Sequence, residues 1–451
     1  MMKALVTERG MLTRSINMLA GKSIGKGIKE VDVPRPKIAK NEILVKVRAT
    51  ALNPIDAKFI DFIAPSGNIA GCDFAGVVEE IRQDAPGGWK VNDRVAGFVQ
   101  GSIDKGRGAF AEYINVEGDL AWKIPDEVSD EEAATFGIPA VTAMQALYLH
   151  LDIPWPAADG TAANSVGTPI FIYGGSSSVG LFAIQLAKKS GFTVITTASP
   201  HSFDLVKKYG ADDVFDYHQP TAAQDIAVKY PNITRALDCF SEGKSTQFCA
   251  EVLKRSGSKV VTLLDSKANV PGVKVEMIMS FQLLGKAFAW LPPIGHKFSA
   301  SPKEREALVM FYASLNELAK TINPPPIKTM TPGFQGILEV FDYGMTHVCR
   351  DNGSMVNTGI SDVLPIHLRL PMKLIIAIRA RSVDVAGWIA LHAAAVAGPE
   401  SHGQFLMDKE IVEPASYINS AEGQKVQKML WNETVDEMSK LTTVPAWMRK
   451  V

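Results

Sequence analysis

The sequence contains few cysteines. Among its 451 residues only four occur, and they are widely scattered: Cys72, Cys239, Cys249 and Cys349. No two of them form a CxxC pair, which disfavours both a disulfide framework and a structural zinc site. Free and scattered thiols fit a reducing compartment, so we expect the protein in the cytosol.

An excess of charge of one sign is also missing. The 47 basic and 48 acidic residues give a formal net charge of −1. The chain therefore has no general electrostatic reason to bind nucleic acid or an anionic membrane, and we expect a small-molecule substrate. With 46% hydrophobic and 21% charged residues, 451 residues predict two or three folded domains and exclude a disordered chain.

Long apolar runs are lacking as well. Even the apolar segment 373–398 is interrupted by Arg379, Arg381 and Asp384, whereas a membrane-spanning helix needs roughly 18 uninterrupted apolar residues. The N-terminus carries charge from Lys3 onward and has no apolar core of a signal peptide. The sequence thus predicts neither a membrane span nor a secretion signal.

The first 160 residues show short stretches in which apolar and polar residues alternate. Examples are 43–54, 76–81, 93–99 and 110–116, with glycine, proline and asparagine interspersed among them. This alternation is typical of half-buried strands, and it predicts a mostly antiparallel β domain.

The pattern then changes to that of an α/β protein. The segment 130–151 has helical apolar spacing, and 170-IFIYGG is an apolar run of strand length followed by glycines. Further strands are predicted at 193, 213, 235 and 258, separated by helical segments. Strands and helices alternating at this spacing predict βαβ units in a doubly wound parallel sheet, and 323–333 is a proline-rich extended return.

A glycine turn stands where the first buried strand passes into a helix, in 170-IFIYGGSSSVGLFAIQLAKKSG-191. Gly174 and Gly175 permit a tight turn and a close backbone approach, and Gly180 permits close packing of helix on sheet. The serines at 176–178 add hydroxyls around N–H groups that would face a pyrophosphate. The turn predicts a dinucleotide site, although an ordinary βα turn without a ligand is the alternative.

The end of the second strand favours NADPH over NADH. NAD-binding sites of this type carry a carboxylate there for the ribose 2′-hydroxyl, but 196-TTASPHS-202 contains none, and Asp204 already belongs to the next helix. Ser199, His201 and Ser202 could donate to a 2′-phosphate, with two lysines one turn later. His201 and Ser202 could equally cap the helix, and both roles can hold together. Tyr217 could contact the adenine or ribose, or simply pack.

The chain resembles the medium-chain dehydrogenase/reductase superfamily, and within it the fungal trans-acting enoyl reductases that work beside polyketide synthases. The resemblance covers about residues 1–345. It is carried by the nucleotide unit together with these segments: 50-TALNPIDAK-58, 71-GCDFAGVVEEI-81, 92-NDRVAGF-98, 108-GAFAEY-113, 122-WKIPDEVSDEEAATFG-137, 199-SPHSFDLVKKYGADDVFDY-217, 237-LDCFSEGKSTQFC-249 and 329-TMTPGFQGILEVFDYG-344.

The resemblance implies a split architecture. A GroES-like catalytic domain would cover 1–160 and resume at about 320–345, and an NADPH-binding Rossmann domain would cover 161–319. Zinc-dependent members carry a ligand cysteine where this chain has Asn53 and Asp56 in 52-LNPID, and no four-cysteine cluster occurs. We therefore expect a metal-free enzyme and conjugate reduction rather than chemistry that needs a Lewis acid.

In the implied reaction, NADPH delivers a hydride to the β-carbon of an α,β-unsaturated thioester or ketone, and an enolate develops on the carbonyl oxygen. By resemblance Lys58 lies near the substrate and the cofactor ribose and is the candidate catalytic residue; its alternative is a solvated lysine. The candidate cofactor-binding residues are Pro54, Asp56, Gly175, Ser176, Ser177, Ser178, Val179, Gly180, Ser199, Pro200, His201, Ser202, Tyr217, Leu264 and Asp265. The candidate substrate-binding residues, which suit an ordinary core equally well, are Pro139, Ala140, Val141, Thr142, Ala143, Met144, Gly285, Lys286, Ala287, Phe288 and Ala289.

The C-terminal part departs from this family. Residues 346–451 resemble the end of a fungal short-chain dehydrogenase, but the catalytic Tyr-xxx-Lys of those enzymes is missing from the whole chain. We expect a mostly helical, non-catalytic appendage, with Trp388 on one apolar face and a last amphipathic helix over 421–441. A packing element, a gene fusion and an incorrect gene model are the three alternatives for its origin.

Three functions remain open on the sequence. The first is an enoyl reductase that acts on a small-molecule or acyl-carrier-bound enoyl substrate, with a polyketide synthase as possible partner and the monomer as favoured state. The second is a free-standing quinone or alkenal reductase. The third is an NADPH-binding protein without redox activity.

Overall fold

The computed structural model divides into two compact units. The first comprises Met1–Met345 with Asn357–Pro365, and the second comprises Thr346–Val356 with Ile366–Val451. The structure describes residues 1–11, 13–14, 17, 27–156, 167–290, 297–330, 332–343, 405–407 and 410–412. Within these residues no helix is both long and apolar enough to cross a membrane.

The N-terminal part of the first unit is an antiparallel β structure, as the alternating pattern predicts. A five-stranded sheet has the order β6-β3-β4-β5-β7. Its strands are β3 (Glu42–Ala51), β4 (Asp73–Ile81), β5 (Arg94–Phe98), β6 (Tyr113–Glu117) and β7 (Trp122–Lys123). Beside it β1 (Met2–Thr7) pairs with β2 (Ile28–Val33).

Short helices or helical turns follow β3, β6 and β7. After β3 come α2 (Pro54–Lys58) and the π-helical turn η1 (Phe59–Ile63), and the 3-10 turn η2 spans Gly118–Leu120. The predicted helical segment is present as α3 (Asp130–Ala134), α4 (Ile138–Met144) and the π-helical turn η3 (Gln145–His150). Helix α3 begins at a capping box in which Ser129 and Glu132 satisfy each other's backbone N–H groups.

A six-stranded parallel sheet forms the second half of this unit, with the order β10-β9-β8-β11-β12-β13. The strands are β8 (Pro169–Tyr173), β9 (Thr193–Ala198), β10 (Asp213–Asp216), β11 (Arg235–Asp238), β12 (Ser258–Thr262) and β13 (Val273–Met277). Numbered along the chain, this order is 3-2-1-4-5-6, the doubly wound arrangement that binds dinucleotides where the strand order reverses. The point of reversal lies between β8 and β11.

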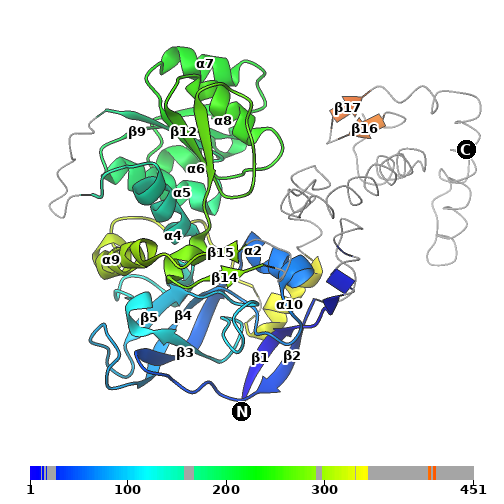
Figure 1. The fold of residues 1–451 in the computed structure, drawn as a ribbon, viewed down its shortest axis with the longest axis vertical. Helices are drawn as coiled ribbons and strands as arrows, with labels where there is room; N and C mark the ends of the chain where they lie inside the picture. Colours follow the sequence, from blue (N-terminus) through cyan, green and yellow to red (C-terminus); the bar gives the residue numbers. More distant parts are fainter. Residues whose placement is uncertain are drawn as a thin grey trace, which may run out of the picture. The chain divides into compact units, whose positions relative to one another are not determined.

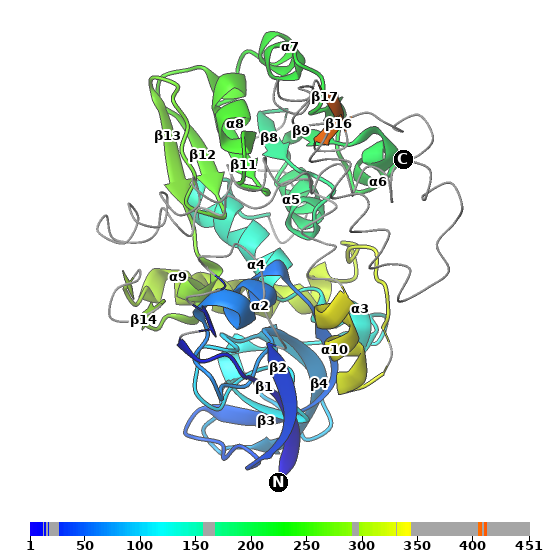
Figure 2. The same ribbon diagram turned by 90° about the vertical axis from the view of Figure 1, so that its right-hand side faces the viewer.

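Helices cover both faces of the parallel sheet (Figures 1 and 2). On one face α5 (Ser178–Lys189) and α6 (Phe203–Lys208) join the core that also contains α4. On the other face α7 (Ala222–Lys229) and α8 (Ser245–Leu253) pack around Phe171 and Ile195. Because both faces are covered, β8 is apolar without interruption at positions 170–172.

The chain then returns to the antiparallel sheet. Helix α9 (Pro302–Leu318) adds Leu308 and Phe311 to the core shared with α4 and α5, and α10 (Phe334–Tyr343) packs Ile337 against the core of the first sheet. The ring centroids of Phe341 and Phe110 are 6.1 Å apart. The smaller elements are η4 (Pro200–Ser202), η5 (Ser280–Leu284), β14 (Phe288–Ala289) and β15 (Lys297–Phe298).

Two predictions fall partly or wholly outside the described residues. The predicted domain boundary near residue 160 lies in the undescribed segment 157–166. Most of residues 346–451, including Trp388 and 421–441, also lie outside the described residues. In the second unit the described residues form one antiparallel pair, β16 (Phe405–Met407) with β17 (Glu410–Val412). The domain limits and the helical appendage therefore stay predictions.

Candidate active site

The glycine turn joins β8 to α5 at the point where the strand order reverses. Gly174 has a left-handed φ of +73°, which a glycine adopts without steric cost. Ser177 caps α5: its Oγ accepts a hydrogen bond from Gly180 N at 3.1 Å and donates to Gly174 O at 2.8 Å. The hydroxyl of Ser177 is thus engaged in shaping the turn, while Ser178 is exposed at the start of the helix.

Steric contacts explain two of the glycines. A Cβ at Gly180 would lie 2.4 Å from Gly174 O, so the helix could not approach the turn with any side chain there. A Cβ at Gly175 would lie 2.1 Å from Thr196 Oγ1, in the neighbouring strand β9. In this structure a glycine is therefore needed at position 175 because β9 packs closely against it. The approach of a pyrophosphate, which the sequence predicts, would be a second reason.

The end of β9 carries hydroxyls and no carboxylate. Ser199 precedes η4, and its Oγ lies 3.1 Å from the hydroxyl oxygen of Tyr217, which follows β10. Pro200, His201 and Tyr217 are exposed. These residues therefore form an exposed edge without a carboxylate beside the glycine turn.

The loops after β11 and β12 meet at the same edge of the sheet. Leu263 N donates to Ser241 Oγ at 2.8 Å, which ties the loop after β12 to the loop after β11. Leu264 and Asp265 follow directly and are half-buried. Leu264 and Asp265, two of the candidate cofactor-binding residues, therefore lie beyond the carboxyl end of β12, beside β11 at the reversal of strand order.

Lys58 is the last residue of α2. Its Nζ lies 3.0 Å from Glu242 Oε1, in the loop between β11 and α8, and each side chain is about a quarter exposed (24% and 23%). The ion pair therefore connects the segment after β3 to the carboxyl end of the parallel sheet. Lys58 is paired and only partly exposed, which differs from the alternative of a solvated lysine.

The start of α2 is fixed by buried polar groups. Asn53 N donates to Asp56 Oδ2 at 2.8 Å, and Asn53 Nδ2 donates to Asp73 Oδ2 at 2.8 Å. Asp73 Oδ1 accepts from Ile138 N, also at 2.8 Å. Asp56 is fully buried whereas Pro54 is exposed, so Asp56 holds the start of α2 from within the protein.

The residues of this region do not fit a zinc ion. Burial raises the pKa of Asp56 to about 6 and that of Asp73 well above its ordinary value. Burial, together with these two acids, also raises the pKa of the Cys72 thiol, whereas zinc binds the thiolate. Among the described residues no group of three or more His, Cys, Asp or Glu side chains could hold a metal ion.

The predicted substrate residues lie in two different environments. In α4, residues 140, 141, 143 and 144 are fully buried in the core, which leaves them little surface for a ligand. In the second segment Gly285 has a left-handed φ of +74°, Lys286 pairs with Glu117, and Ala287 is exposed. Phe288 and Ala289 form β14, where the Phe288 ring stacks on Phe298 at 4.6 Å. The second segment therefore has the larger accessible surface.

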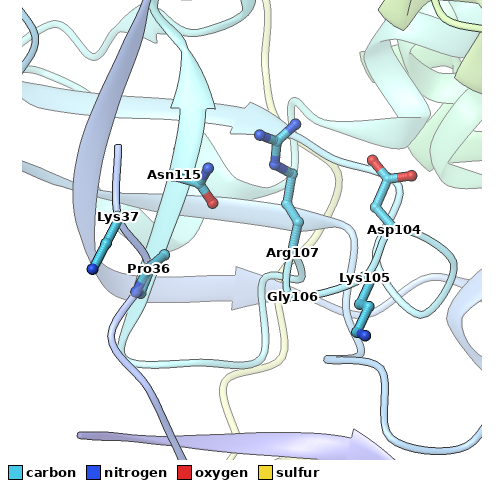
Figure 3. Close-up of a pocket in the computed structure, with 7 residues that line it drawn as sticks. All are labelled: Pro36, Lys37, Asp104, Lys105, Gly106, Arg107 and Asn115. Atoms are coloured by element: carbon cyan, nitrogen blue, oxygen red, sulfur yellow. The ribbon is translucent and has the colours of Figure 1, made fainter. Parts of the chain in front are cut away.

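A polar cavity of about 390 Å³ lies elsewhere, along the antiparallel sheet (Figure 3). Its lining is Pro36, Lys37, Asp104, Lys105, Gly106, Arg107 and Asn115. Arg107 and Asn115 both donate to the carboxylate of Glu42. These side-chain groups are therefore already engaged in a structural contact. None of the predicted site residues lines this cavity, so we assign it no part in the chemistry.

Glu242 and Asp73 carry no signal of their own in the sequence, although both stand in segments that carry the family resemblance. Glu242 is in 237-LDCFSEGKSTQFC-249, and Asp73 is in 71-GCDFAGVVEEI-81. An isolated acid in a loop or at a strand end has no pattern of its own. Glu242 is identified by its contact with Lys58, and Asp73 by its contact with Asn53.

Comparison with family models agrees with the two halves of the first unit. Residues 39–126 match the alcohol dehydrogenase GroES-like domain, and residues 178–288 match the zinc-binding dehydrogenase domain. The second match extends from the start of α5 to the start of β14 and so covers most of the parallel sheet.

Curated relatives are trans-enoyl reductases from fungi. The chain is 37% identical over 317 residues to trans-enoyl reductase FSL5 of Gibberella zeae, covering 68% of this chain and 87% of the relative. It is 40% identical over 256 residues to trans-enoyl reductase TOXD of Cochliobolus carbonum, covering 56% of this chain and 85% of the relative.

Solved structures show the same fold at low identity. The CurK enoyl reductase is 15% identical with a TM-score of 0.57, and the match covers 76% of this chain and 96% of that chain. A mycobacterial protein in complex with NADPH is 20% identical with a TM-score of 0.52, and the match covers 76% and 95%. The strand order, the glycine turn and the fungal relatives agree with each other and with a nicotinamide cofactor, and the chain belongs to the medium-chain dehydrogenase/reductase family, in the group of the fungal trans-enoyl reductases.

Proposed function

We propose that this protein uses NADPH to reduce the carbon-carbon double bond of an enoyl thioester, acting in trans on intermediates of a polyketide synthase. The observation that carries the proposal is the position of Lys58, whose ammonium group lies 3.0 Å from Glu242 at the carboxyl edge of the parallel sheet. In sheets with this strand order the dinucleotide binds at that edge. A cation is thus available where a reacting carbonyl would lie.

The chain supplies orientation and a hydrogen-bond donor. When bound, the reduced nicotinamide supplies a hydride to the β-carbon of the conjugated thioester. The backbone N–H groups at the start of α5 would hold the pyrophosphate, because a helix N-terminus favours anions. Lys58 would donate a hydrogen bond to the oxygen on which the enolate charge develops, and a proton from solvent would complete the α-carbon.

NADPH is preferred over NADH in this proposal. The edge formed by Ser199, His201 and Tyr217 offers hydrogen-bond donors, and β9 contributes no carboxylate that would repel a 2′-phosphate. Charge-assisted hydrogen bonds to a phosphate are worth about 1.5–3 kcal/mol each. Fluorescence titration should therefore give a dissociation constant at least about tenfold lower for NADPH, and equal constants would refute the preference.

The role of Lys58 can be tested by Lys58→Ala. A donor that acts on developing charge helps the transition state more than the ground state, so turnover should fall by about tenfold or more while the NADPH dissociation constant stays within about twofold. Lys58→Arg, which keeps the charge, is the matched comparison. An unchanged kcat in the alanine variant would return Lys58 to a purely structural role.

The substrate class is tested by measuring NADPH oxidation with three kinds of acceptor in parallel. An enoyl pantetheine thioester, or the same enoyl group on an acyl carrier, should be reduced with a higher kcat/KM than a quinone or a simple alkenal. A higher kcat/KM for quinone or alkenal would favour a free-standing detoxifying reductase.

We further propose a cytosolic, monomeric enzyme, and light scattering tests the monomer.

A further inference from the structure

The loop between β11 and α8 is held by hydrogen bonds to one buried acid. Asp238, fully buried at the end of β11, accepts from Phe240 N at 3.1 Å and Ser241 N at 2.8 Å through one carboxylate oxygen. Its other oxygen accepts from Ser245 Oγ and Thr246 Oγ1, both at 2.7 Å. Both ends of the loop are therefore anchored on one buried carboxylate.

Two residues of this loop adopt left-handed backbone conformations, one on each side of Glu242. Ser241 has φ +58° and Gly243 has φ +60°. For a residue with a Cβ this conformation is sterically unfavourable, and it persists only where surrounding contacts enforce it. Ser241 is 3% exposed, and its hydroxyl donates to Asp238 O and accepts from Leu263 N. The fold therefore bears strain to set the direction of Glu242.

The helix that carries Lys58, the partner of Glu242, is also held in place. Lys58 ends a five-residue helix whose start is held by Asn53 and by the buried acids Asp56 and Asp73. The 3.0 Å contact between Lys58 Nζ and Glu242 Oε1 thus joins two well-anchored segments that lie 184 residues apart in the chain. Both side chains are about three-quarters covered, so water screens the pair less than it would at the open surface.

We infer that Glu242 is a positioning residue for the proposed reduction: it holds the Lys58 ammonium group at the carboxyl edge of the sheet, ready to donate to the substrate oxygen. The inference rests on the proposed function. Glu242 does not transfer a proton in this assignment. It restricts the lysine side chain, which otherwise has four flexible carbons and a large rotamer entropy.

The first test needs no substrate. In the cofactor-free protein, Lys58 in Glu242→Gln should react several-fold faster with an amine-reactive reagent such as acetic anhydride, as followed by peptide mass spectrometry. Glu251→Gln is the matched control, because Glu251 lies on the adjacent helix α8 and bonds Gln247 instead. Equal Lys58 labelling rates in Glu242→Gln and the unaltered protein would overturn the inference, whatever the enzyme reduces.

The second test is a double-mutant cycle in turnover. Glu242→Gln should lower kcat with an enoyl thioester by about five- to tenfold while NADPH affinity stays within about twofold. In the Lys58→Ala background the same change should have no further effect. Independent, multiplying losses would show that Glu242 does not act through Lys58. If the unaltered protein reduces no enoyl substrate, the proposed function fails, and the labelling rates still decide whether Glu242 holds Lys58.

Discussion

The helices α5 and α4 begin in two different ways. Helix α5 is capped from within its own sequence, since Ser177 Oγ accepts from Gly180 N only three residues later. Helix α4 is capped from far away, since Ile138 N donates to the carboxylate of Asp73, 65 residues earlier in the chain. The first cap belongs to the nucleotide turn, and the second belongs to the buried network that also holds α2 and Lys58.

The two caps correspond to two functions of the proposed site, pyrophosphate binding and placement of a catalytic side chain. Binding a pyrophosphate requires backbone N–H groups, and a short local sequence can present these by itself. Placing a catalytic side chain requires segments that are distant in the chain to keep a fixed distance. Here the buried carboxylate of Asp73 connects β4, Asn53 and the start of α4.

Gly180→Val should give the largest effect, because it breaks the local turn by steric overlap. A Cβ at this position would lie 2.4 Å from Gly174 O and 2.8 Å from Gly175 Cα. Both contacts are with backbone, which cannot move aside, so we expect loss of cofactor binding and of several kcal/mol of stability. Thermal unfolding and NADPH titration measure both. Gly10→Val, where a Cβ meets nothing within 4 Å, should change neither.

Asp73→Ala should break the long-range cap. The change leaves Asn53 Nδ2 and Ile138 N buried without their acceptor, at about 1–3 kcal/mol for each donor. We therefore expect a loss of about 3 kcal/mol in the free energy of unfolding by urea, together with reduced turnover because α2 is released. Asp73→Asn keeps an acceptor and should lose less; an equal loss would mean that charge matters more than hydrogen bonding.

The pH dependence of stability should report the buried acids. Burial raises the pKa of Asp56 from 3.8 to about 6, so the native state binds this proton more tightly than the unfolded chain does. The contribution of Asp56 to stability is complete below pH 3.8 and is lost as the pH rises through about 6.

Asp56→Asn removes this dependence. Relative to the unaltered protein, the variant should gain on the order of 3 kcal/mol across that interval in urea unfolding at a series of pH values. Glu131→Gln, a change of an exposed acid in α3, should follow the unaltered protein. Parallel curves for Asp56→Asn and the unaltered protein would contradict the raised pKa.

Ser177→Ala should have the smallest effect. Losing an N-cap hydroxyl costs about 1 kcal/mol, and the turn retains its other backbone hydrogen bonds, including Gly175 N to Thr197 O. A small decrease in melting temperature by circular dichroism is expected. Ser178→Ala, at the exposed neighbouring position, is the control for stability. A loss as large as that of Asp73→Ala would remove the distinction between local and long-range caps.

The sequence predicts much of the fold because most of its signals are local. Alternation in 43–54 and 110–116 identifies strands now seen as β3 and β6, and the apolar run at 170 identifies β8. Strand β13 and helix α9 were not predicted. Strand β13 is five residues long with an exposed lysine at its second position, so its alternation is weak. Helix α9 does carry a start signal, because Ser301 caps it and Pro302 occupies the first helical position.

The site divides along the same line. The sequence by itself determined the nucleotide turn, because Gly174, Ser177 and Gly180 act on one another within seven residues and their chemistry is visible in the order of the letters. Only the tertiary structure decided how Lys58 is held. Glu242 is 184 residues away, and an ion pair across such a separation depends on how two sheets pack, which no local pattern encodes. The buried acids behave likewise, since their raised pKa values come from the surrounding protein rather than from neighbouring residues in the chain.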